Sequence, residues 1–174
     1  MRRDFSFLRR YEVEVDVEFP PRGGQIFFPR EGVATYRLAV RVEPAEAPSW
    51  VGAFAGEGFD FSAVASTPDA DTLCVVARGT GYLVRASDPP TWTTVESFPV
   101  RDLAAIVECG LLVFADHSSL TAYGSDGVVW TRRLGSDDLA IAEATPERIA
   151  GTLWVVGTEV TFSVDAETGR PRPC

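Results

Sequence analysis

The chain has 174 residues, a hydrophobic content of 45%, a charged content of 24% and a formal net charge of −9. This composition is typical of a globular protein and excludes an intrinsically disordered chain. The acidic balance argues against nucleic acid as a partner, because such binding relies on cations that neutralise phosphates. The length suits a single domain, residues 1–174, built around one core.

The residue types that the chain lacks exclude several kinds of catalytic and metal site. All sixteen basic residues are arginine, and lysine and asparagine are absent. The codons of the two missing residues are rich in adenine, which indicates a GC-rich genome of bacterial origin. Without lysine, neither a Schiff base nor a P-loop can form in the usual way. The three cysteines show no metal-binding spacing such as C-x-x-C, and we expect no metal site.

The same sequence indicates a cytoplasmic protein that does not enter a membrane. The first ten residues, MRRDFSFLRR, contain too short an apolar stretch for a signal peptide. The longest apolar candidate, residues 103–115, is interrupted by Glu108 and is too short to span a bilayer. An odd number of widely spaced cysteines fits reduced thiols better than disulfides.

The first predicted element is a strand over residues 11–19, where apolar and acidic side chains alternate without a break. Two prolines follow and end it. Residues 33–43 predict a second strand. If the two strands pair, Arg37 and Arg41 lie near the acidic row and balance its charge. A cation or partner site on that row is the alternative.

Residues 44–48 contain two prolines and are the predicted internal boundary. They divide the domain into an N-terminal strand pair, residues 1–48, and blade-like repeats, residues 49–174.

The charge is divided unevenly along the chain. Residues 1–50 hold eight arginines and eight acids, whereas residues 51–174 hold eight arginines and seventeen acids, so the whole excess of −9 lies in the second part.

A repeat begins near Leu73, in which strand, turn, strand, turn and strand follow one another. The units cover residues 73–98, residues 111–134 and, in truncated form, residues 153–169, with linking strands at residues 103–107 and 139–144. A period of about 40 residues with about four short strands per unit is typical of propeller blades. No window longer than ten residues has the period and caps of a helix.

Two segments carry a resemblance to a known family. The segment FSVDAETGR, residues 162–170, resembles the turn of quinoprotein-type β-propeller blades, in which a strand leads into Asp-x-x-Thr-Gly. The segment AYGSDGVVW, residues 122–130, is similar, with a tryptophan where such blades often place one. The same strand and Asp-Gly pattern resembles that of small uncharacterised bacterial proteins. The resemblance covers about residues 71–170 and implies a propeller-like strand arrangement.

The chain departs from that family in two respects. It contains about three units, whereas propellers generally close with four to eight blades. No residues match the cofactor and calcium sites of the quinoprotein enzymes, so the resemblance implies no activity, and we expect no cofactor. We predict an all-β fold of short antiparallel meander units, forming incomplete propeller-like repeats. A β-sandwich is the alternative, because short strands with frequent turns occur in both.

The segment Asp116-His117-Ser118 contains the residue types of a catalytic triad in one line. Neighbours on an extended strand point to opposite faces and cannot meet as acid, base and nucleophile. The position indicates a hairpin loop, where Asp and Ser bond to the local backbone. A ligand-binding His117 is the alternative and would need a partner from another turn, with Asp88 and Asp138 as candidates.

Three further residues are candidates for binding. Asp137 and Asp138 are predicted to lie in a solvated turn between strands. Trp92 follows a proline-stiffened loop, which is typical of a binding edge, although packing against the sheet is the alternative. The other tryptophans are predicted to anchor the core: Trp50, Trp130 and Trp154.

These observations favour a non-catalytic protein-binding module of bacterial origin, whose acidic loops engage a basic protein. An immunity-type inhibitor of a basic toxin is one concrete form, since opposite charges speed the encounter of two proteins. The alternative is a small-molecule or carbohydrate-processing enzyme that uses His117 with turn carboxylates.

Overall fold

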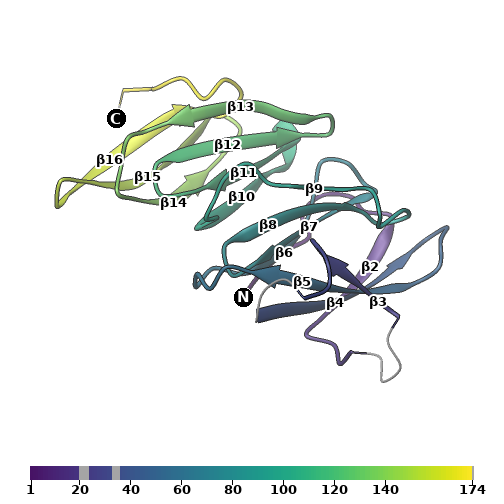
Figure 1. The fold of residues 1–174 in the computed structure, drawn as a ribbon. Helices are drawn as coiled ribbons and strands as arrows, with labels where there is room; N and C mark the ends of the chain where they lie inside the picture. Colours follow the sequence, from purple (N-terminus) through teal and green to yellow (C-terminus); the bar gives the residue numbers. More distant parts are fainter. Residues whose placement is uncertain (20–23, 33–35, 174) are drawn as a thin grey trace. The chain divides into compact units, whose positions relative to one another are not determined.

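The computed structural model describes residues 1–19, 24–32 and 36–173, and nearly all of its regular structure is strand. The chain forms two compact units, which we call the N-terminal unit (Met1–Ser66 and Ala70–Val95) and the C-terminal unit (Thr67–Asp69 and Glu96–Cys174). Each unit contains two small sheets (Figure 1). The predicted all-β fold of short antiparallel meanders is confirmed.

One sheet of the N-terminal unit has the strand order β1-β6-β7-β8-β9. Its strands are β1 (Arg2–Asp4), β6 (Ala63–Ser66), β7 (Thr72–Ala77), β8 (Thr80–Arg85) and β9 (Trp92–Thr94). β1 pairs parallel with β6, and the meander from β6 to β9 is antiparallel throughout. β7, β8 and β9 are the three strands predicted for the first repeat.

The second sheet of this unit has the order β2-β4-β5-β3. Its strands are β2 (Tyr11–Val15), β4 (Tyr36–Pro44), β5 (Trp50–Gly56) and β3 (Gln25–Phe28). β2 ends before the predicted limit at residue 19, because Asp16 has a left-handed backbone (φ 62°) that a strand cannot continue. Residues 20–23 and 33–35, which include the two predicted strand-ending prolines and the start of the predicted second strand, lie outside the described residues.

Charge balance on the acidic row follows from the pairing of β2 with β4. The antiparallel register places Glu14 opposite Arg41, and the two side chains form an ion pair with a separation of 2.5 Å. Arg37 instead makes a cation–π contact, in which its guanidinium lies 4.6 Å from the centre of the Phe27 ring. The predicted boundary, residues 44–48, begins at the last residue of β4 and continues into the turn before β5, and these two strands pair with each other. The division between the compact units falls near Val95 in the sequence.

The C-terminal unit contains the second and third predicted repeats. Its first sheet has the order β10-β11-β12-β13, and its second has the order β14-β15-β16, with antiparallel neighbours throughout. The strands are β10 (Asp102–Ile106), β11 (Leu111–Ala115), β12 (Ser119–Gly124), β13 (Gly127–Arg133), β14 (Asp138–Ala144), β15 (Arg148–Val155) and β16 (Thr158–Asp165). Both linking strands are therefore present, as β10 and β14.

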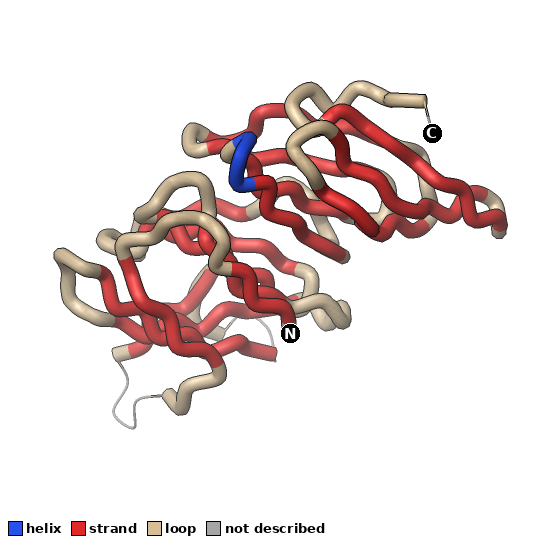
Figure 2. The backbone as a smooth tube through the Cα atoms, turned by 180° about the vertical axis from the view of Figure 1, so that it is seen from behind, coloured by secondary structure: helices blue, strands red, loops and turns tan. Residues whose placement is uncertain are grey.

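Helix is confined to one turn in the part of the chain that the structure describes. This 3₁₀ turn, Val107–Cys109, joins β10 to β11 (Figure 2). It ends at Gly110, whose left-handed backbone (φ 61°) returns the chain to the next strand. Among the same residues, no helix has the length and apolar character needed to cross a bilayer.

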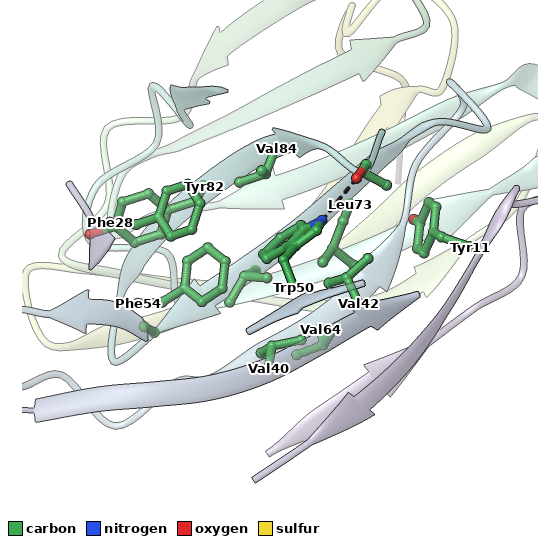
Figure 3. Close-up of a cluster of buried hydrophobic side chains, with 13 residues drawn as sticks. Tyr11, Phe28, Val40, Val42, Trp50, Phe54, Val64, Leu73, Tyr82 and Val84 are labelled. Atoms are coloured by element: carbon green, nitrogen blue, oxygen red, sulfur yellow. Dashed lines mark hydrogen bonds between the residues drawn. The ribbon is translucent and has the colours of Figure 1, made fainter. Parts of the chain in front are cut away.

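The core of the N-terminal unit lies between its two sheets and is aromatic (Figure 3). The Phe28 and Phe54 rings stack with their centres 4.4 Å apart. The indole of Trp50 donates a hydrogen bond to the carbonyl of Ala86 (2.9 Å), and the Tyr82 hydroxyl donates to that of Ala55 (2.8 Å). Burial, and secondarily the charge of Glu57, raises the pKa of Tyr82 to about 12. The polar atoms of these large side chains are thus satisfied inside the core.

The core of the C-terminal unit is mainly aliphatic and lies between sheets β10–β13 and β14–β16. Its buried side chains include Leu120, Leu139, Ile149, Leu153 and Phe162. Trp130 closes the core at one side, because its ring covers Gly169 and its indole donates a hydrogen bond to the carbonyl of Ala166 (3.0 Å).

The stacked phenylalanines give a direct test of the N-terminal core. We expect Phe54→Ala to lower the free energy of unfolding by about 3–5 kcal/mol, since it removes a fully buried ring and leaves a cavity. Urea denaturation measures the loss. Phe19→Ala is the matched control, because Phe19 is 42% exposed, and it should cost less than about 0.5 kcal/mol. Similar losses for the two variants would contradict the assignment of Phe54 to the core.

Candidate functional site

Most of the predicted site residues lie in turns at one end of the C-terminal unit. The turns are residues 116–118 between β11 and β12, residues 134–137 between β13 and β14, and residues 156–157 between β15 and β16. Together with Arg101, which precedes β10, we call them the His117 end. Backbone hydrogen bonds tie them together, from Leu134 to the carbonyl of Ser118 (2.7 Å) and from Asp137 to the carbonyl of Trp154 (2.8 Å).

The Asp116 carboxylate holds the first turn in shape. Its Oδ1 accepts hydrogen bonds from the backbone N–H groups of Ser118 (2.7 Å) and Ser119 (2.8 Å), and its Oδ2 accepts from the Ser119 hydroxyl. This is the local backbone bonding predicted for Asp and Ser in a hairpin loop. Because both oxygens are engaged, Asp116 is a structural residue of the turn.

His117 lies between two turns. Its backbone carbonyl accepts a hydrogen bond from the Ser136 hydroxyl (2.7 Å). Its ring is 41% exposed, yet the Nδ1 atom is buried and has no hydrogen-bond partner among the described residues. The nearest acidic oxygen is Oδ1 of Asp138, at 4.0 Å, so of the two predicted partners the structure brings Asp138 close. No hydrogen bond in the described part of the chain joins the ring to a Ser, Thr or Cys side chain.

The Asp138 carboxylate is also engaged. Arg101 lies 3.3 Å from Oδ1 and 3.4 Å from Oδ2, and the backbone N–H of Leu139 donates to Oδ1 (3.0 Å). This carboxylate is therefore already neutralised by a guanidinium. His117, Arg101 and Asp138 therefore form a small polar network at the surface.

The pairing of β14, β15 and β16 adds a feature that the sequence did not predict. Trp154 lies opposite Asp138 on one side and Glu159 on the other. Directly opposed residues in antiparallel strands project from the same face of the sheet, so the indole stands between two carboxylates. Trp154 is 44% exposed, and its prediction as a core anchor is wrong. Val155 and Val160 are also exposed but lie on the opposite face of the sheet, and the exposed Val156 lies in the turn.

The remaining predicted candidates lie in the N-terminal unit. Trp92, on the edge strand β9, is half-buried and packs against the rings of Phe28 (5.8 Å between centres) and Tyr82 (5.9 Å). The Asp88 carboxylate accepts a hydrogen bond from the Thr91 hydroxyl (2.6 Å) in the loop before it. The structure thus gathers Asp116, His117, Asp137 and Asp138 in one place, and gives Trp92 the packing role that was its alternative.

A second concentration of acids surrounds Cys109, at the 3₁₀ turn. Burial raises the pKa of the Cys109 thiol, and so do the nearby carboxylates of Glu167, Glu108, Glu147 and Asp165. Burial alone raises the pKa of Cys74 far above its usual range. In the described residues, no three His, Cys, Asp or Glu side chains are grouped as metal ligands.

The comparisons with known proteins add no family to these observations. No protein-family model and no curated protein sequence matches this chain.

Because Asp116 holds its turn together, replacing it should destabilise the protein more than replacing Asp137. We expect Asp116→Ala to lower the free energy of unfolding by about 1–3 kcal/mol, because two backbone N–H groups lose their acceptor. Asp137→Ala is the control, since Asp137 is exposed and only its backbone N–H bonds to a neighbour. Thermal or urea unfolding distinguishes them. Equal stability of Asp116→Ala and the unmodified chain would show that the turn does not depend on the carboxylate.

The raised thiol pKa values predict slow alkylation. Thiolate is the reactive form, so Cys109 should react with iodoacetamide more slowly than free cysteine at mildly alkaline pH, and faster as the pH rises. Salt should accelerate the reaction by screening the carboxylates, and so should Glu167→Gln. Peptide mass spectrometry follows Cys109 separately from the other cysteines. A rate at or above that of free cysteine would contradict the acidic surroundings.

Proposed function

We propose that this protein is a non-catalytic binding module of a bacterial cytoplasm and that its C-terminal unit presents an acidic surface to a basic partner protein. The observation that carries the proposal is the distribution of charge between the units. The C-terminal unit holds thirteen Asp and Glu residues against six Arg, a net charge of −7. The N-terminal unit holds twelve against ten, a net charge of −2.

The exposure of the acids supports this role. Asp137 and Glu159, at the His117 end, are exposed. Three acids close to Cys109 are exposed as well: Glu108, Glu147 and Glu167. Burial is the main cause of the raised pKa of the Cys109 thiol, and the charges of these acids raise it further. Such a surface attracts a positively charged protein over a distance of about one Debye length and speeds the encounter. An immunity-type inhibitor of a basic toxin is the concrete form that fits the size and charge of the chain.

One observation favours the second candidate, a small-molecule or carbohydrate-processing enzyme. It is the unpartnered Nδ1 of His117, 4.0 Å from Asp138, in a partly exposed turn. Against it stand the ion pair of Asp138 with Arg101 and the use of Asp116 in its turn. His117→Ala separates the two functions: an enzyme would lose its activity, whereas the binding module would keep its affinity within about twofold.

The proposal is tested by capturing basic proteins from a bacterial lysate on the immobilised chain and measuring their association. The proposal predicts capture at about 50 mM salt that is lost at about 500 mM. Asp137→Asn combined with Glu159→Gln should slow association about threefold to tenfold, because it removes charges that steer the partner.

The matched control is Glu18→Gln combined with Glu46→Gln, which removes two exposed acids from the N-terminal unit. It should leave association within about twofold of the unmodified chain. Failure to capture any basic protein at low salt, or equal slowing by the two double variants, would contradict the proposed function.

A further inference from the structure

The hairpin formed by β15 and β16 extends beyond the core of the C-terminal unit. The inward-facing residues Ile149 and Phe162 are buried near its base, whereas every residue from 154 to 161 is exposed. Four of these are large and apolar: Trp154, Val155, Val156 and Val160. We call residues 154–160 the hairpin tip. Trp154 stands on one face of the hairpin, Val155 and Val160 stand on the other, and Val156 lies at the turn, so the tip is apolar and exposed on both faces.

The turn of the hairpin tip requires a backbone conformation that is unfavourable for valine. Val156 and Gly157 both have positive φ (50° and 76°), as a two-residue hairpin turn requires. A β-branched residue rarely adopts this conformation, and Gly or Asp would be the usual choice. Val156 is also 90% exposed, so its side chain contributes almost nothing to the core. Neither the backbone nor the packing of this unit therefore accounts for a valine here.

A second hairpin in the same chain shows how such a turn is covered. Arg78 and Gly79, between β7 and β8, also have positive φ (43° and 90°). There the preceding segment packs on the turn: the Phe59 N–H donates to the carbonyl of Arg78 (3.2 Å) and the Gly79 N–H donates to that of Phe61 (2.8 Å). A Cβ on Gly79 would lie 2.8 Å from the Phe59 side chain.

The corresponding turn of the hairpin tip is bare. A Cβ on Gly157 would meet nothing within 4 Å. Among the described residues, no segment outside the hairpin donates a backbone hydrogen bond to Val156 or Gly157, or accepts one from them. Two turns of the same kind thus differ in one respect, namely that the chain covers the first with its own apolar segment and leaves the second open.

The charges around the hairpin tip specify what can cover it. Trp154 stands between Glu159 and Asp138 in the sheet, and Asp138 is already paired with Arg101. Asp137 is bonded through its backbone N–H to the Trp154 carbonyl. Glu159 is exposed and forms no ion pair with another described residue. An indole beside the carboxylate of Glu159 suits a guanidinium, which can lie on the aromatic face and pair with that acid at the same time.

We infer that the hairpin tip is the contact surface for a basic protein segment that places an arginine side chain on Trp154, beside Glu159, and an apolar side chain on Val156 at the turn. This inference rests on the proposed function and names the part of the C-terminal unit that makes it. A second copy of the chain is a poorer occupant, because it would bring Glu159 and Asp137 of one copy against acids of the other. An anionic lipid surface is excluded by the same repulsion.

The test uses the full chain and a short synthetic peptide of alternating arginine and leucine. A matched peptide carries citrulline, which keeps the shape of arginine and lacks its charge. Binding is followed by titration calorimetry and by tryptophan fluorescence. We expect the arginine peptide to bind about tenfold more tightly than the citrulline peptide and to change the emission of Trp154.

Two variants locate the contact. Trp154→Ser should weaken binding of the arginine peptide about tenfold, and Val156→Gly should weaken it as well. Val156→Gly cannot act through unfolding, because glycine adopts the positive φ of this turn more readily than valine, so the variant should be at least as stable as the unmodified chain. Val129→Ser, which changes an exposed valine on β13, is the control and should bind as the unmodified chain does.

The outcomes separate the inference from the proposed function. Salt-sensitive binding of the arginine peptide that is equal in the unmodified chain, Trp154→Ser and Val156→Gly would overturn the inference and leave the proposed acidic surface standing elsewhere. Absence of binding to any arginine peptide at low salt would overturn both. Sedimentation that shows a dimer which Trp154→Ser dissociates would identify a second copy as the occupant and overturn the assignment of a basic partner.

Discussion

Burial of Leu139 and Leu153 in the core of the C-terminal unit is the constraint on which the His117 end depends. Side chains alternate between the two faces of a strand, so turning these leucines inward sends their neighbours Asp138 and Trp154 to the other face. The same register sets Glu159 beside Trp154. A slip of β14 by one residue would turn Asp138 into the position of a buried leucine, at a cost of several kcal/mol. The apolar core thus fixes the acid-flanked tryptophan on the surface.

Local patterns predicted much of this fold. Alternating apolar residues and turn signals located the strands of all three repeats and the two linking strands, β10 and β14, because both signals lie within a few residues of what they specify. The Asp116 turn follows equally from its own sequence. Asp138 was one of two partners considered for His117, and proximity selected it only when β14 was placed beside the turn that contains His117.

Features that depend on packing between distant segments could not be predicted in this way. Arg101 reaches Asp138 because residues far apart in sequence meet at the edge of two packed sheets. Trp154 was predicted to lie in the core, because a continuous apolar run, residues 153–156, does not reveal which of its side chains face the neighbouring sheet. The positive φ of Val156 is equally hidden, since residue preferences predict the opposite. Both of these features, the exposure of Trp154 and the positive φ of Val156, belong to the hairpin tip.

Hydrogen–deuterium exchange of the full chain, with and without the arginine–leucine peptide, measures most directly where a basic ligand binds. Our account predicts slower exchange of the backbone amides of residues 153–161 and of the Asp137–Asp138 turn in the presence of the peptide, with no change in the acidic strand β2. Binding of the peptide with unchanged exchange in residues 153–161, or with slower exchange confined to β2 and β4, would contradict it.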